Sequence, residues 1–115
     1  MEEKKAQITV VVVIHNAEIY VERCLNSLIE QDTDQFHVIL VDDGSSDQSL
    51  DICRSVLGRM KVPVRLLELP HRGVANARNC GLEQVDTPYV LFLDSDDWLD
   101  RNTISNMIEL ANIHQ

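Results

Sequence analysis

Apolar residues occur along the chain in short runs that alternate with amphipathic segments. The runs are largely continuous and rich in β-branched residues, which is typical of strands covered on both faces. They predict strands at residues 8–14, 37–43, 64–69 and 89–94. The segments between them repeat apolar residues at spacings of three and four, which is typical of helices with one buried stripe. They predict helices at about residues 17–31, 46–60, 74–85 and, from residue 100 or 102, up to 113.

Residues at the ends of these segments add local signals. Ser46 or Asp47 is a candidate N-cap for the second helix. Pro63 and Pro70 bound the third strand, and Gly81 weakens the third helix. These signals agree with the elements that the apolar pattern predicts.

The order of the elements predicts the fold class. Strands that alternate with helices imply right-handed crossovers, so we expect an α/β fold with a mostly parallel sheet of about four strands and helices on both faces. Sheets of this kind bind ligands beyond the carboxyl ends of their strands. The acidic segments "VDDGSSD" (41–47) and "LDSDD" (93–97) begin at the ends of the second and fourth strands. They are therefore predicted to face one crevice.

Length and charge narrow the classes of function. The 115 residues suit a single domain. Ten Lys plus Arg against nineteen Asp plus Glu give a formal charge of −9, which disfavours nucleic acid or an anionic membrane as a partner. The apolar run at 8–14 is too short to cross a bilayer, and Glu2 and Glu3 do not fit the positive end of a signal peptide.

The cysteines suggest the compartment. Cys24, Cys53 and Cys80 are far apart, form no C-x-x-C pair and fall within predicted helices. We interpret them as reduced, buried thiols of a cytoplasmic protein. The full-length protein could also lie at the inner face of the membrane, and the cysteines do not decide this.

The segment "YVLFLDSDDWLD" crowds four carboxylates, Asp94, Asp96, Asp97 and Asp100, within seven positions. Two carboxylates about 5 Å apart repel each other by roughly 3 kcal/mol at an effective dielectric constant near 20, before salt screening. One interpretation is structural: Asp97 and Asp100 cap the next helix while Asp94 and Asp96 point into water. The other is a metal site, and the segment alone leaves both open.

The residue types around this segment restrict the metal. An EF-hand loop starting at Asp94 is excluded, because Trp98 and Leu99 stand where an oxygen ligand and a glycine are needed. Oxygen ligands at a rigid strand end suit Mg²⁺ or Mn²⁺, which complete their coordination with water and ligand phosphates. The chain has no glycine-rich phosphate-binding motif.

Four motifs occur in a fixed order along the chain. They are "VIHN" (13–16), "VDDGSSD" (41–47), "GVANARNCG" (73–81) and "FLDSDD" (92–97). In order and spacing the chain resembles the nucleotide-binding half of a family 2 glycosyltransferase of the GT-A, Rossmann-like fold. The resemblance implies transfer of a sugar from a nucleotide-sugar donor, a UDP-sugar first of all, to the hydroxyl of an unknown glycan, lipid or polysaccharide acceptor.

The resemblance also implies roles for residues that contact the nucleotide. Asp43 would hydrogen-bond the base, although it could instead cap the 44–47 turn, a role that suits Asp42 better. Arg78 would face the diphosphate or the base, because a guanidinium offers forked donors to phosphate oxygens. The alternative for Arg78 is an ion pair with the nearby carboxylates.

For the metal, the resemblance implies Asp96 as the chief ligand of Mn²⁺ or Mg²⁺. Asp94 and Asp97 would contact ribose, water or the ion, and the sequence does not apportion these contacts. Asn16 and Ser95 join the predicted nucleotide-binding residues through their motifs.

The chain departs from the family pattern at two positions of its first motif. Val13 replaces the usual proline, and His15 replaces the usual tyrosine, which stacks on the base. Imidazole also stacks, with less area, and it can donate a hydrogen bond. His71 and Arg72 could approach phosphate but are expected on a solvated loop.

The length of the chain is a further departure. Inverting family members use a carboxylate base that is supplied after the donor-binding half. The sequence ends one helix after "DSDD", so we expect the base and the acceptor site beyond residue 115, and name no catalytic residue. We expect this truncated chain to bind donor and metal without transferring sugar.

Two rival interpretations belong to other classes. A receiver domain has similar length and an acidic Mg²⁺ site, but its acidic pair follows the first strand, and Lys4, Lys5 and Lys61 do not follow a late strand as its lysine does. A non-catalytic module, whose sheet serves only association, would bind no nucleotide in the presence of metal.

Overall fold

The strands of the chain form one parallel sheet. A computed structural model describes residues 5–113. Its strands are β1 (Ile8–Ile14), β2 (Phe36–Asp43), β3 (Val64–Leu69) and β4 (Tyr89–Asp94). The sheet has the order β3-β2-β1-β4, and each neighbouring pair is parallel. The predicted fold class and strand positions are confirmed.

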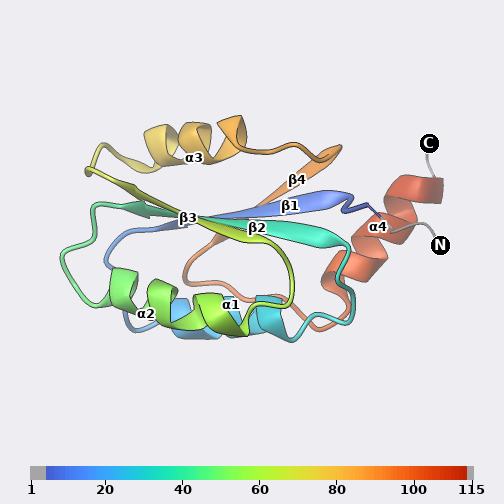
Figure 1. The fold of residues 1–115 in the computed structure, drawn as a ribbon, viewed down its shortest axis with the longest axis horizontal. Coiled ribbons are helices and arrows are strands. Elements are labelled where there is room, and N and C mark those ends of the chain that lie inside the picture. Colours follow the sequence, from blue (N-terminus) through green and yellow to red (C-terminus); the bar gives the residue numbers. More distant parts are fainter. Residues whose placement is uncertain (1–4, 114–115) are drawn as a thin grey trace.

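Helices cover both faces of this sheet. They are α1 (Val21–Ile29), α2 (Ser49–Val56), α3 (Val74–Glu83) and α4 (Thr103–Ile113), with a 3₁₀ turn, η1 (Leu57–Arg59), after α2. Figure 1 shows α1 and α2 below the sheet and α3 above it, with α4 beyond one end. Within residues 5–113, every helix is too short or too polar to cross a bilayer.

The first helix begins later than predicted. The apolar pattern placed it at 17–31, but α1 starts at Val21, because the residues before it form a turn. The backbone N–H of Ala17 in this turn donates a hydrogen bond to Ser49 Oγ (2.7 Å), at the start of α2. This N–H is thus satisfied across the fold, while the Ala17 carbonyl accepts a hydrogen bond from the Val21 N–H (2.8 Å) at the start of α1.

The second helix is also shorter than predicted. It begins at Ser49 and not at residue 46, and its N-cap position is Gln48. The predicted cap Asp47 still satisfies the helix start, because its carboxylate accepts a hydrogen bond from the Ser49 N–H (2.9 Å). Ser46 has no such contact with the helix and bonds Asn16 instead.

The main core lies between the sheet and the pair α1 and α2. Its largest fully buried side chains come from β1, β2, α1 and α4: Ile14, Phe36, Leu40, Leu25, Leu28 and Ile104. A smaller cluster lies under α3 and consists of Val11, Ile39, Val41 and Ala77. The central strand β1 is buried along nearly all its length because both its faces and both its edges are covered.

Gly81 lets α3 pack close to the sheet. A Cβ at this position would lie 2.7 Å from Val11 Cγ1 and 3.1 Å from Val41 Cγ2. The residue that weakens the helix as a local segment is thus required by its contact with the strands.

The cysteines differ in burial. Cys24 and Cys53 are buried, and burial raises the pKa of both thiols to about 12. Cys80 is only half-buried, so the expectation that all three are buried is wrong for Cys80. All three are free thiols, as predicted.

We predict that Gly81→Ala destabilises the fold by about 1–3 kcal/mol, because the added methyl forces α3 away from the sheet. Gly58→Ala is the matched control, because a Cβ at Gly58 meets no atom within 4 Å. Urea denaturation of both variants would measure the difference. Equal midpoints would contradict the close-packing explanation.

Candidate functional site

The predicted site residues gather at the carboxyl ends of β1, β2 and β4. A pocket of about 400 Å³ opens there between the strand ends and the loops that follow. Six of the eight predicted site residues line it: His15, Asn16, Asp43, Asp94, Ser95 and Asp96. Arg78 and Asp97 lie beside it through their contacts with Asp94.

Three carboxylates form a cluster at the end of β4. Carboxylate oxygens of Asp94, Asp96 and Asp97 all lie within 4.8 Å of one another, and the three residues are exposed. A tight turn produces this arrangement, in which the Asp97 N–H donates to the Asp94 carbonyl (3.0 Å). An oxygen-only ligand set of this kind fits Mg²⁺ or Mn²⁺.

Arg78 balances part of this charge. Its Nη2 lies 3.3 Å from Asp94 Oδ1, and its guanidinium carbon lies 5.9 Å from the centre of the Phe92 ring. The structure therefore has the ion pair that the sequence left as the alternative for Arg78. Because both side chains are about half exposed or more, the pair is screened by water and leaves the guanidinium accessible.

Asp43 is buried, and amide groups surround its carboxylate. Oδ1 accepts a hydrogen bond from the Arg72 N–H (2.9 Å), and Oδ2 accepts one from the Gly73 N–H (3.1 Å). Oδ2 also lies 3.0 Å from His71 Nδ1. Burial alone would raise the pKa of Asp43, but these hydrogen bonds outweigh it and lower the pKa below its usual value.

His71 stacks on His15. The two ring centres are 4.1 Å apart, with an angle of 14° between the planes. His15 Nδ1 lies 2.8 Å from the Asp43 carbonyl oxygen, while His71 Nδ1 lies beside the Asp43 carboxylate. The His71 ring therefore covers one face of His15 and bonds one carboxylate oxygen of Asp43. These are the two groups that, by the resemblance, would contact the nucleotide base. His71 lies on an exposed loop, as expected, but its ring also contacts His15 and Asp43.

Sequence reasoning considered His71 only for phosphate and missed its contacts with His15 and Asp43. The position of His71 follows from β3, which lies next to β2 and pairs Leu69 with Asp43. The loop after β3 therefore returns beside Asp43. The sequence did show a strand that ends two residues before His71. Only the strand order, which the sequence does not give, places the end of this strand beside Asp43.

The two imidazoles and Asp43 do not form a convincing metal site. One ligand atom from each lies within 4.8 Å of the others. A metal ion lies in the plane of an imidazole that binds it, and the nearly parallel stacked planes of His15 and His71 do not meet at a common ion. The acidic cluster is therefore the better cation site.

Asn16 joins the first and second loops. Its backbone φ is 48°, in the left-handed region that Asn tolerates better than most residues. Its Oδ1 accepts a hydrogen bond from the Ser46 N–H (2.8 Å), and its own N–H donates to Ser45 Oγ (3.0 Å). Asp42 Oδ2 accepts from the Ser45 N–H (3.1 Å), which confirms its predicted turn role.

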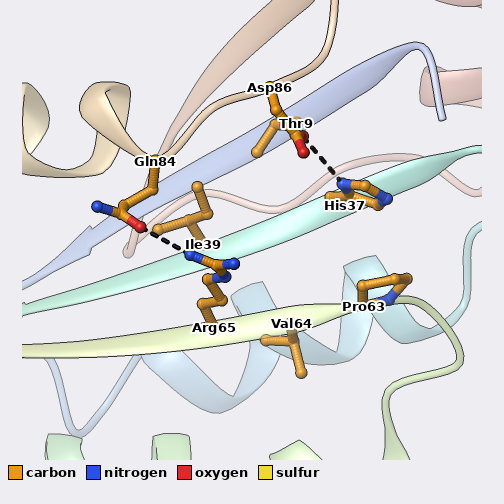
Figure 2. A pocket seen from close by; sticks show the side chains of 8 residues that line it. All are labelled: Thr9, His37, Ile39, Pro63, Val64, Arg65, Gln84 and Asp86. Carbon is orange, nitrogen blue, oxygen red and sulfur yellow. Dashed lines mark hydrogen bonds and ion pairs between the residues drawn. The ribbon is translucent and has the colours of Figure 1, made fainter.

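A second hollow of about 250 Å³ lies at the opposite end of the sheet, near the starts of the strands. Figure 2 shows its lining, in which His37 faces Asp86 (3.6 Å) and Arg65 bonds Gln84 (2.7 Å). Its charged side chains already have partners in the hollow. It is separate from the acidic cluster and from the pocket at the carboxyl ends.

The sequence matches a known family over nearly its whole length. Residues 9–115 match the family model described as "Glycosyl transferase family 2". The chain belongs to this family. This family 2 chain spans only part of the curated relatives it matches, for example 14% of one and 40% of another.

Two relatives of the family 2 chain come from staphylococci. A teichoic acid poly(glycerol phosphate) polymerase of Staphylococcus epidermidis is 39% identical over 107 residues, which cover 92% of this chain and 15% of the relative. The poly(ribitol-phosphate) β-N-acetylglucosaminyltransferase TarS of Staphylococcus aureus is 35% identical over 108 residues, 92% of this chain and 19% of TarS.

Solved structures resemble the family 2 chain in fold. The crystal structure of S. aureus TarS 1-349 with UDP superposes with a TM-score of 0.83 at 34% identity and covers 94% of this chain and 32% of that one. The mannosyltransferase PcManGT of Pyrobaculum calidifontis, in complex with GDP-Man and Mn²⁺, has a TM-score of 0.79 at 28% identity, covering 91% and 32%.

We predict that Asp43→Asn destabilises the protein by about 1–3 kcal/mol near pH 7, because it weakens the bonds to the 71–73 loop. The native pKa of Asp43 lies below its unfolded value. The contribution of the charge is therefore present above about pH 4, the unfolded pKa, and is lost as pH falls through the native pKa.

Urea denaturation between about pH 7 and pH 3 would test this, since the difference between wild type and Asp43→Asn should shrink over the acidic part of the range. Asp34→Asn, at an exposed residue, is the control. A difference that stays constant at all pH values would mean that the charge of Asp43 does not hold the loop.

Proposed function

We propose that this chain is one domain, residues 1–115, that supplies the donor-binding half of a glycosyltransferase. The enzyme would transfer the sugar of a nucleotide-diphosphate sugar to an acceptor hydroxyl. The observation that carries the proposal is the single pocket that joins His15 and Asp43 to Asp94 and Asp96. A nucleotide diphosphate has two matching parts, a flat base and a charged diphosphate.

In this proposal the acidic cluster binds Mn²⁺ or Mg²⁺. Asp96 is the chief ligand, and Asp94 and Asp97 complete the set or hold the ribose and metal-bound water. When bound, the ion neutralises charge on the diphosphate leaving group. The Mn²⁺ in the mannosyltransferase complex supports this assignment.

Arg78 and the residues at the base end complete the proposed site. Arg78 would leave its weak pair with Asp94 to donate to phosphate oxygens. His15 would stack on the base, Asp43 would accept a hydrogen bond from it, and Asn16 and Ser95 would contact the nucleotide from the same pocket. We assign no catalytic base among residues 5–113.

A UDP-sugar is the first candidate donor. TarS, at 34% identity, is solved with UDP and with UDP-GlcNAc. PcManGT, at 28% identity, is solved with GDP-Man.

Calorimetric titration with UDP in the presence of Mn²⁺, and again with excess chelator, tests the proposal. We expect binding only with the metal, and we expect Asp96→Asn to weaken it by at least about tenfold. Asp51→Asn, at an exposed position of α2, should bind as wild type does. An absence of metal-dependent binding would favour the rival view of a module that serves only association.

Stability gives a second readout for Asp96. Its carboxylate is exposed and Arg78 is paired with the neighbouring Asp94, so relief of repulsion in Asp96→Asn should raise stability in chelator by no more than about 0.5 kcal/mol. With Mn²⁺ and UDP at a hundredfold excess over Kd, wild type should gain about 2.7 kcal/mol, and the variant much less. Thermal unfolding with and without ligands would measure both effects.

We also predict that His71→Ala strengthens UDP binding several-fold, because the His71 ring must leave His15 and Asp43 before a base can take both contacts. The backbone bonds from Arg72 and Gly73 to Asp43 remain in this variant. His37→Ala, in the distant hollow, is the control. Weaker binding by His71→Ala would show instead that the base lies against both rings.

A further inference from the structure

One side of α1 and the residues just after it face the loop that carries the acidic cluster. Cys24, Ser27 and Gln31 follow one another at spacings of three and four, which places them on the same side of a helix. The end of β4 and the loop from β4 to α4 lie along this side, where Asp94, Leu99 and Asp100 contact it.

Ser27 links α1 to this loop from a buried position. Its Oγ donates a hydrogen bond to the Cys24 carbonyl (2.6 Å) and accepts one from the Leu99 N–H (3.0 Å). The hydroxyl therefore uses both its donor and an acceptor position, and it fixes the backbone two residues after Asp97.

Gln31 makes a wider link. Its Nε2 donates to the Asp100 carbonyl (2.6 Å) and to the Ser27 carbonyl (3.0 Å). Its Oε1 accepts a hydrogen bond from the Ile104 N–H (3.1 Å), at the start of α4. One amide side chain thus joins α1, the loop and the last helix.

Further contacts hold the same loop. The Cys24 thiol lies 3.7 Å from the Asp94 carbonyl oxygen, the Asp32 N–H donates to the Arg101 carbonyl (2.9 Å), and the Arg23 guanidinium lies 3.4 Å from the centre of the Trp98 ring. The backbone is therefore held on both sides of Asp96 and Asp97, whose own side chains are exposed.

We propose that Ser27 and Gln31 are positioning residues for the metal-binding carboxylates. Three like charges within a few ångströms repel one another, so a free loop would spread them apart when no ion is bound. The bonds from Ser27 and Gln31 keep the loop in the turn that brings the carboxylates together. This inference rests on the proposed metal-dependent function.

The test compares Ser27→Ala and Gln31→Ala with two matched controls. Ser55→Ala removes a hydroxyl that donates to the carbonyl three residues earlier, as Ser27 does, but that lies at an exposed position of α2. Gln84→Ala removes an amide that bonds Arg65 in the distant hollow. The Kd for Mn²⁺ is measured from the electron paramagnetic resonance of the free ion, at a temperature where circular dichroism shows every variant folded.

We expect the Kd for Mn²⁺ to rise about tenfold in Ser27→Ala and in Gln31→Ala, as for other partners that support metal ligands, and to stay unchanged in both controls. Trp98 is the single tryptophan, so its quenching by acrylamide should also increase in the two variants. If Ser27→Ala does not fold, the half-buried Gln31 decides the matter.

The alternatives give different results. A merely structural role would lower the unfolding midpoint of both variants but leave the Kd of the folded protein unchanged, which would overturn the inference while the proposed function stands. A wild-type chain that binds no Mn²⁺, with or without UDP, would overturn the proposed function and this inference together.

Discussion

The parallel pairing of β1 with both its neighbours determines where the chemistry of this chain lies. Ile14 pairs with Asp42 of β2, and Val13 pairs with Asp94 of β4. The two acidic segments, about fifty residues apart in sequence, therefore end at the same edge, one on each side of the central strand. The loops after β2 and β4 therefore both leave the sheet at this edge, because the two strands run parallel to β1.

The carboxylates of the two acidic segments differ in burial and in hydrogen bonding. Asp43 is buried, and its carboxylate is satisfied by the amides of the loop before α3. The cluster at Asp94, Asp96 and Asp97 is open to water, and among its members Asp94 is paired with Arg78. The carboxylate at the β2 end of the pocket is thus hydrogen-bonded within the protein, whereas the carboxylates at the β4 end are exposed to water.

Much of the fold could be predicted from the sequence, because the strand runs and helical stripes are strong local patterns. The exact starts of α1 and α2 could not, because the turns before them depend on contacts between the two loops, such as the hydrogen bond from the Ala17 N–H to Ser49 Oγ. The contacts of His71 were missed for a related reason: they depend on β3 lying next to β2. The motifs predicted that the acidic segments face one crevice, and the structure has them at one pocket. The individual contacts of these residues could not be predicted, because they arise in loops that have no periodic pattern.

The contacts of the first loop have a consequence for how such a site can diversify. The ring at position 15 is held through a main-chain oxygen of Asp43 and by stacking on His71, and a substitution at this position leaves the main-chain oxygen in place. The next position, Asn16, combines a left-handed backbone with bonds to Ser45 and Ser46. Few residue types satisfy both demands. A position whose hydrogen bond involves only its side chain therefore stands directly before one whose backbone and side chain are both committed, so the first can vary at less cost to the loop than the second.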